Sequence, residues 1–117
     1  MPSMTTIARL DDLNFYEVLA ATAGPALVYF TAPSCAACKS LKHALERYSH
    51  YYPPLPMFEV DAVHNGGLVR ALEVFHLPAL FLYVNGHYHR QLHCEVLPGE
   101  IHYAIETALK LPAEEEP

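Results

Sequence analysis

Apolar residues along this chain of 117 residues fall into short runs, and the runs alternate with segments in which apolar positions recur at helical spacing. The runs predict β-strands at Thr5 to Leu10, Ala26 to Thr31, Met57 to Val60, Ala79 to Val84 and Tyr88 to Cys94. The second run has almost no polar residue, which is typical of a strand buried on both faces. Asn85-Gly86 separates the last two runs and is the strongest short signal for a β-hairpin.

Between the runs, four segments show the spacing of amphipathic helices. Their inner faces would carry Phe15, Val18, Leu19 and Thr22; Cys38, Leu41, Leu45 and Tyr48; Leu68, Leu72 and Phe75; and Ile101, Ile105 and Ala108. We expect Asp11 or Asp12 to cap the first helix, and Pro53-Pro54 to end the second. This order predicts an α/β fold with a mixed central sheet, whose parallel core carries an antiparallel C-terminal hairpin, flanked by about four helices.

Composition limits the chain to one domain. With 52% apolar and 17% charged residues, it has enough apolar surface for one core. We place this domain at residues 1–111 and expect residues 112–117, which include Glu114-Glu115-Glu116, to form a solvated acidic tail. The net charge of −6 argues against nucleic acid and anionic membrane as partners, and we expect a monomer.

The sequence also predicts where the protein works. It begins with no basic region followed by a long apolar run, and no window approaches the roughly 18 consecutive apolar residues of a membrane span. We therefore expect neither export nor membrane insertion, and a cytoplasmic location. The chain has three cysteines, and this odd number is more typical of a cytosolic protein with functional thiols than of a secreted protein stabilised by disulfides.

The most informative motif is Cys35-Ala36-Ala37-Cys38, between the predicted buried strand and the second helix. Backbone N–H groups and the helix dipole stabilise a thiolate at such a position. Lowering a thiol pKa from about 8.5 to about 7 raises the thiolate fraction at neutral pH from roughly 3% to about half. Cys35 would then be the nucleophile, and Cys38 the thiol that resolves the mixed disulfide. Two cysteines at this spacing are also half of many zinc sites, so the surrounding sequence has to decide between redox chemistry and zinc binding.

Three blocks of sequence make the chain resemble a thioredoxin over nearly its whole length. They are LVYFTAPSCAACK at residues 27–39, FEVD at 58–61 and HLPALFLYVNG at 76–86. The resemblance implies the thioredoxin fold and thiol–disulfide exchange with protein disulfides, supported by a thiol reductant or reductase, with no organic cofactor and no metal. In that family the proline matching Pro78 is cis and faces the active-site cysteines, and the backbone of the preceding residue, here Leu77, pairs with substrate.

Several positions depart from the family's pattern. Ser34 and Thr31 stand where thioredoxins usually have tryptophan, so the substrate-facing surface around Ser34 must differ. Tyr29 replaces the buried aspartate that relays a proton to the resolving cysteine, and Met57 replaces the lysine that accompanies it. Without that acid, deprotonation of Cys38 has to rely on water or another group, and we expect slower resolution of mixed disulfides.

A few further residues have two interpretations each. His76 is placed either to bind substrate near Cys35 or to be an exposed loop histidine. Cys94 is either a third redox thiol or a substrate contact, or else a small buried apolar residue. Three histidines share one face of the last predicted strand by parity: His87, His89 and His93. We favour a polar, solvent-facing side for them over a metal-binding surface.

Two functions from different classes remain. The first is a thiol–disulfide oxidoreductase that acts on protein disulfides through Cys35 and Cys38. The second is a non-catalytic binding module of thioredoxin fold, an assembly factor or metal carrier that uses the two thiols as ligands. The lost acid and tryptophans favour the second, whereas the retained cysteines, Pro78 and Lys39 favour the first. We adopt the oxidoreductase as the prediction.

Overall fold

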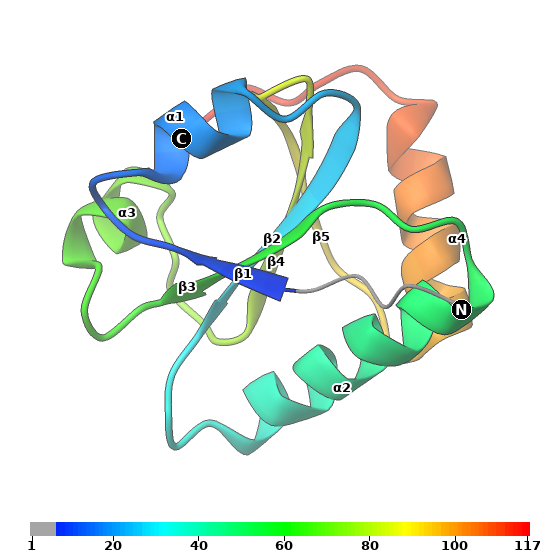
Figure 1. The fold of residues 1–117 in the computed structure, drawn as a ribbon, viewed down its shortest axis with the longest axis horizontal. Helices are drawn as coiled ribbons and strands as arrows, with labels where there is room; N and C mark the ends of the chain where they lie inside the picture. Colours follow the sequence, from blue (N-terminus) through cyan, green and yellow to red (C-terminus); the bar gives the residue numbers. More distant parts are fainter. Residues whose placement is uncertain (1–6) are drawn as a thin grey trace.

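The computed structural model describes residues 7–117, which form a mixed sheet between two layers of helices (Figure 1). The strands are β1 (Ile7–Leu10), β2 (Pro25–Thr31), β3 (Met57–Asp61), β4 (Ala79–Val84) and β5 (His87–Leu92). The helices are α1 (Phe15–Ala20), α2 (Ala36–Tyr51), α3 (Gly66–Ala71) and α4 (Pro98–Leu109). The sheet order is β1-β3-β2-β4-β5, in which β1, β3 and β2 are parallel to one another and β4 is antiparallel to β2 and β5. The predicted architecture is confirmed, and Thr5 and Thr6 of the first predicted strand lie outside the described residues.

β2 is the central strand, and its side chains contribute to both halves of the core. Ala26, Val28 and Phe30 point to the face of the sheet that α1 and α3 cover. Leu27 and Tyr29 point to the opposite face, which α2 and α4 cover. All five side chains are at most 2% exposed. Burial on both faces explains why this run carries almost no polar residue.

The prediction that Asp11 or Asp12 caps the first helix is confirmed for Asp11, which caps the turn that leads into α1 and accepts the N–H of Phe15 on its carbonyl at 3.0 Å, but not for Asp12. α1 begins after Asn14, whose side chain caps no helix N–H group. The Asp11 carboxylate accepts hydrogen bonds from the N–H groups of Leu13 and Asn14, in the turn before the helix, at 2.9 and 3.0 Å. Asp12 accepts the N–H of Leu68 at 3.0 Å, at the start of α3. Asp12 therefore accepts a hydrogen bond from a helix that is distant in sequence, and a local sequence pattern does not reveal such a contact.

None of the helices of residues 7–117 is long and apolar enough to cross a membrane. α3 is shorter than its apolar spacing predicts. α3 ends at Ala71, and the positive φ of Glu73, 52°, turns the chain out of the helical path. Leu68 and Leu72 are buried as predicted, but Phe75 is 80% exposed. The prediction of an inward-facing Phe75 is therefore wrong, because the helix has already ended.

The acidic tail has exposed side chains, but its backbone is not free in solvent. The N–H of Glu114 donates to the carbonyl of His89 on the edge strand β5, at 2.7 Å. The guanidinium of Arg90 donates to the carbonyl of Pro112 at 3.1 and 3.2 Å. The tail thus covers part of an edge that otherwise presents unpaired backbone groups.

The predicted hairpin between β4 and β5 is confirmed, and its turn packs closely on α1. Asn85 and Gly86 have φ values of 52° and 79°, and a type I′ turn needs positive values at both positions. A Cβ added at Gly86 would lie 2.8 Å from the Cα of Ala20 and from the carbonyl oxygen of Leu19. Gly24 also has a positive φ, 73°, but a Cβ there would meet no atom within 4 Å.

We expect Gly86→Ala to destabilise the protein more than its matched control Gly24→Ala. Both variants place a side chain in left-handed backbone, which costs roughly 1–2 kcal/mol. Only Gly86→Ala also pushes the turn away from the backbone of α1. Urea unfolding followed by circular dichroism gives both free energies of unfolding. Equal losses in the two variants would contradict the close packing of the turn on α1.

Candidate active site

The cysteine pair lies where β2 gives way to α2. Cys35 occupies the N-cap position of α2 with an extended backbone, φ −97° and ψ 105°. Its Sγ accepts the N–H of Cys38 at 3.1 Å, and its carbonyl accepts the N–H of Lys39 at 3.2 Å. The sulfur thus receives an N–H group of the first helical turn that has no partner within the helix. This interaction, together with the helix dipole, stabilises a thiolate at Cys35.

Cys35 and Cys38 form a disulfide, and their Cα atoms lie 5.2 Å apart. The two residues differ in access, because Cys38 is 1% exposed whereas Cys35 is only half-buried. The first turn of α2 contains no acidic residue that would oppose a thiolate at Cys35. Cys35 is therefore the more accessible sulfur for an incoming disulfide, and the roles of nucleophile and resolving thiol stay a prediction.

Leu77 and Pro78 lie beside the end of β2, close to where the chain leaves the sheet for the cysteines. The peptide bond between them is cis, as the resemblance implies. The next residue, Ala79, pairs with Phe30 of β2, and this pairing fixes Leu77-Pro78 on the β4 side of that strand. Both residues are half-buried. Their contact with substrate stays a prediction.

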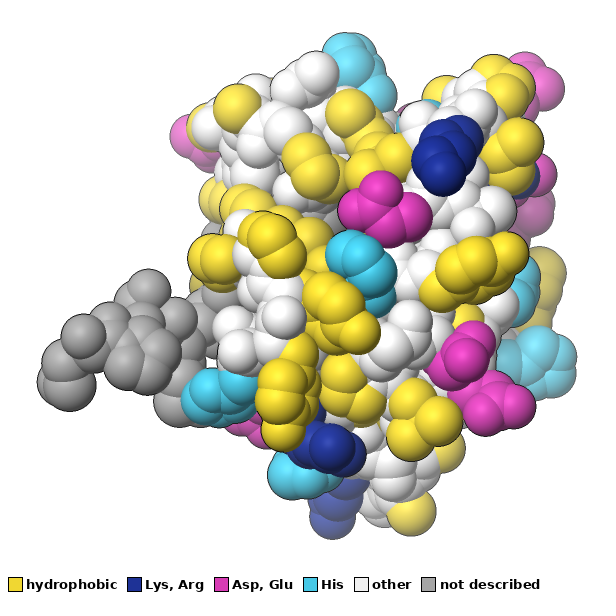
Figure 2. All heavy atoms as spheres, turned by 90° about the vertical axis from the view of Figure 1, so that its right-hand side faces the viewer, with side chains coloured by type: hydrophobic (Ala, Val, Ile, Leu, Met, Phe, Trp, Pro, Cys, Tyr) yellow, Lys and Arg dark blue, Asp and Glu magenta, His cyan; other side chains and the backbone are white. Residues whose placement is uncertain are grey.

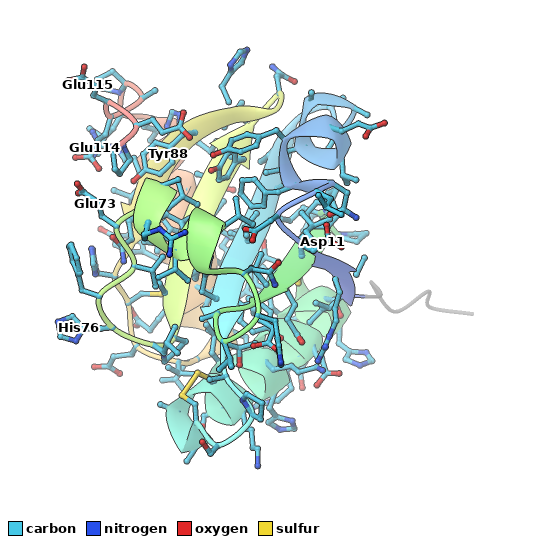
Figure 3. All side chains as sticks on the ribbon, turned by 90° about the vertical axis from the view of Figure 1, so that its left-hand side faces the viewer. Asp11, Glu73, His76, Tyr88, Glu114 and Glu115 are labelled. Atoms are coloured by element: carbon cyan, nitrogen blue, oxygen red, sulfur yellow. A yellow bond between two sulfur atoms is a disulfide. The ribbon has the colours of Figure 1, made fainter. Side chains whose placement is uncertain are left out.

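Ser34 and His76, the other two predicted substrate contacts, are both exposed. Ser34 stands directly before Cys35 in the loop between β2 and α2. His76 lies on the loop before β4, and its ring points outward, away from the disulfide (Figure 3). Binding of substrate by either side chain stays a prediction, and the orientation of His76 is that of an exposed loop residue.

A buried carboxylate that was not predicted from the sequence lies near the pair. Glu59 of β3 is 4% exposed and is in register with Tyr29 of β2. The Tyr29 hydroxyl donates to Glu59 Oε2 at 2.5 Å. Lys42 Nζ lies 3.4 Å from the same oxygen, and Arg9 Nε lies 3.2 Å from Oε1. The signal in the sequence was a charged residue within the apolar run Met57 to Val60, but only the strand register shows that it meets Tyr29.

The environment of Tyr29 keeps its hydroxyl protonated. Burial and the hydrogen bond to Glu59 both raise the pKa of Tyr29 well above its ordinary value. The hydroxyl therefore acts as a donor to Glu59 and takes no negative charge itself. The position at which thioredoxins carry a buried acid is thus a tyrosine here, and the buried acid of this chain lies one strand away.

A cavity of about 190 Å³ lies beside Cys38 and Glu59. It is lined by Arg9, Thr31, Ala32, Pro33, Cys38, Lys39, Lys42, Glu59 and Asp61. His64 Nδ1 lies 2.7 Å from Asp61 Oδ2, and this hydrogen bond is the main reason that the pKa of Asp61 is below its ordinary value. The buried thiol and the buried carboxylate thus open onto one shared space of mixed charge.

The three histidines that were predicted to share one strand face are separated. A bulge in β5 leaves His89 between the paired residues Tyr88 and Arg90, and His89 Nε2 lies 2.7 Å from the Ala108 carbonyl oxygen. His93 lies beyond the end of the strand. Figure 2 shows histidine side chains scattered over the face that carries α4. Within residues 7–117, no three His, Cys, Asp or Glu side chains come together in a group that could hold a metal ion.

Cys94 lies in the segment between β5 and α4, two residues after Leu92, which pairs with Leu80 of β4. It is a free, half-buried thiol that lines a cavity of about 340 Å³ between β5 and α4. Burial, and to a lesser degree the negative charge of Glu100, raise the pKa of Cys94. A raised pKa disfavours the thiolate, which fits the interpretation as a small structural residue better than that of a redox thiol.

Comparison with known proteins agrees with this geometry. The thioredoxin family model matches residues 6–107. "Thioredoxin O, mitochondrial" of Oryza sativa subsp. japonica is 30% identical over 64 residues, which are 53% of this chain and 37% of that protein. The thioredoxin of Griffithsia pacifica is 24% identical over 82 residues, 69% of this chain and 75% of that one.

Among solved structures, human ERp44 (form I) superimposes with a TM-score of 0.74 at 23% identity, over 90% of this chain and 30% of that one. This similarity concerns the fold. The chain thus spans well under two thirds of the rice protein and of ERp44. The family model covers nearly all of the chain, and the cis peptide bond before Pro78 and the cysteine pair at the start of α2 match what the resemblance implies. The chain belongs to the thioredoxin family.

Proposed function

We propose that this protein is a thiol–disulfide oxidoreductase that acts on protein disulfides. The observation that carries the proposal is the difference between its two active-site sulfurs: an accessible one at the N-cap of α2 and a buried one a single turn further on. The first can attack a substrate, and the second can only react with the first. This asymmetry suits two-step disulfide exchange and has no use in a simple binding module.

In the reducing direction, the Cys35 thiolate attacks one sulfur of a substrate disulfide. A bond forms between Cys35 and that sulfur, and the other substrate sulfur leaves as a thiolate and takes a proton from water. Cys38 then attacks Cys35 as a thiolate, the Cys35–Cys38 disulfide forms, and the second substrate sulfur leaves. Two electrons pass to the substrate, and a thiol reductant or reductase must return them to the pair.

We also propose that the protein works as a monomer in the cytoplasm. An odd number of cysteines, with Cys94 free, supports a reducing environment. The net charge of −6 supports protein substrates over nucleic acid. The alternative of a metal carrier has less support, because structural zinc usually takes four ligands and the pair supplies two.

In the reduced protein, we expect Cys35 to be alkylated fastest and at the lowest pH, because the helix N-terminus stabilises its thiolate. Cys94, whose pKa is raised by burial, serves as a slow internal reference in the same molecule. Short exposure to iodoacetamide between pH 5 and 9, read by mass spectrometry of peptides, gives the three rates. If Cys38 reacts before Cys35, the roles assigned to the two thiols are reversed.

We expect the protein to catalyse the reduction of insulin by dithiothreitol, measured as turbidity. Cys35→Ala should abolish turnover, and Cys38→Ser should trap a mixed disulfide with the substrate that mass spectrometry detects. The matched control Cys94→Ala removes the third thiol and should keep full activity. Tight stoichiometric zinc on the pair without any turnover would instead favour the metal carrier.

A further inference from the structure

Cys38 has to lose its proton before it can resolve a mixed disulfide, because the thiolate is the attacking species. At 1% exposure, its sulfur is poorly reached by bulk water. The cavity beside it offers a route for the proton. A volume of about 190 Å³ has room for several water molecules, since one needs roughly 10–15 Å³. The groups that line this cavity therefore decide where the proton goes.

Two carboxylates line the cavity, and they differ in burial and in hydrogen-bond partners. Asp61 is hydrogen-bonded through one oxygen to His64 and through the other to the N–H of Val63, and both bonds lower the pKa of Asp61. The Glu59 side chain is 6% exposed, against 15% for that of Asp61. Glu59 is therefore the more buried of the two carboxylates.

The groups around Glu59 hold its carboxylate in place. Arg9 of β1 and Lys42 of α2 bring two positive charges to its oxygens, at 3.2 and 3.4 Å. Tyr29 of β2 donates its hydroxyl to Oε2. The other charged groups near this site are Lys39, Glu46 and Asp61. A carboxylate has about four acceptor positions, so these three contacts leave one free for water.

We propose that Glu59 receives the proton of Cys38 through water held in this cavity. The inference rests on the proposed oxidoreductase function. Cys38 gives its proton to a water molecule, which passes a proton to the Glu59 carboxylate. The Cys38 thiolate then attacks Cys35, the bond between Cys35 and the substrate breaks, and the substrate sulfur leaves with the electron pair of that bond. Glu59 later returns its proton to water, from which the departing substrate thiolate takes one up, and the two electrons of the dithiol have passed to the substrate.

The test separates the two steps of exchange in one reaction. Mixing reduced protein with an equimolar amount of dithiodipyridine, a neutral disulfide, releases thiopyridone when Cys35 attacks and again when Cys38 resolves the mixed disulfide. In Glu59→Gln we expect an unchanged first phase and a second phase slowed at least about tenfold at pH 6, since general bases contribute about 10²- to 10⁴-fold.

The pH profile of the second phase is a readout that a merely structural role would not move. With Glu59 as proton acceptor, the rate levels off once the carboxylate is ionised. In Glu59→Gln only the thiolate already present reacts, so the rate should rise about tenfold per pH unit up to the pKa of Cys38. The same slope in both proteins would overturn the proposal.

Asp61→Asn is the matched control, because it removes the same charge from the same cavity. We expect both of its phases to stay within about twofold of the parent. Removing a negative charge near Cys38 favours its thiolate and by itself speeds the second phase. An unchanged or faster second phase in Glu59→Gln therefore overturns the proposal. A parent protein that lacks the first phase argues against the oxidoreductase function instead.

Tyr29→Phe tests the same site while keeping the carboxylate, which matters if Glu59→Gln folds poorly. Loss of the hydroxyl removes a hydrogen bond to the ionised form of Glu59, so the carboxylate becomes easier to protonate. The pH at which the second phase falls off should then move upward. An unshifted fall-off in a folded Tyr29→Phe variant would contradict the role of Glu59.

Discussion

The burial of β2 is the constraint on which the site depends. β2 is paired with β3 on one side and with β4 on the other, and helices cover both of its faces. Because neighbours hold β2 on all four sides, its place in the fold is fixed, and so is the place of Thr31 at its end. The loop to Cys35 is short, and the first turn of α2 is therefore fixed as well. The sulfur then meets the N–H of Cys38 without any rearrangement, which is what a pre-formed thiolate site requires.

The same burial sets a limit on charge in the core. Taking an ion out of water costs several kcal/mol, so a buried carboxylate persists only with good partners. Glu59 has three, and they come from β1, β2 and α2. Two of them, Arg9 and Lys42, keep much of their own surface in solvent, with 73% and 48% exposed side chains, and so lose little hydration. Tyr29 fills core volume with its ring and satisfies an oxygen with its hydroxyl.

Much of the fold could be predicted from local sequence patterns, and the predictions that were wrong have a common cause. β2, α2 and the Asn85-Gly86 hairpin were predictable, because strong periodicity and turn chemistry are properties of neighbouring residues. Asp12 was assigned to the wrong helix because its partner Leu68 is distant in sequence. Phe75 was placed inside because the turn at Glu73 leaves no trace in the apolar spacing.

The candidate site likewise has residues that could be predicted from local sequence and one that could not. Cys35 and Cys38 were predictable from their spacing and setting, since a thiol at a helix start is a local arrangement. Glu59 was not, because its meaning depends on a strand register that brings it opposite Tyr29. The pairing of β2 with β3 is a contact between segments far apart in the chain. A single charge inside an apolar run indicates only that some partner must exist elsewhere.

The order of the strands places the Glu59 cavity and the Leu77-Pro78 segment on opposite sides of β2. The cavity with Glu59 lies on the β3 and β1 side of β2, together with the first turns of α2. Leu77-Pro78, where the resemblance places substrate, lies on the β4 side. A substrate held there would approach Cys35 from one flank, while the proton of Cys38 leaves by the other. Because the two routes do not overlap, a bound substrate would leave the proton route open during the step that needs it.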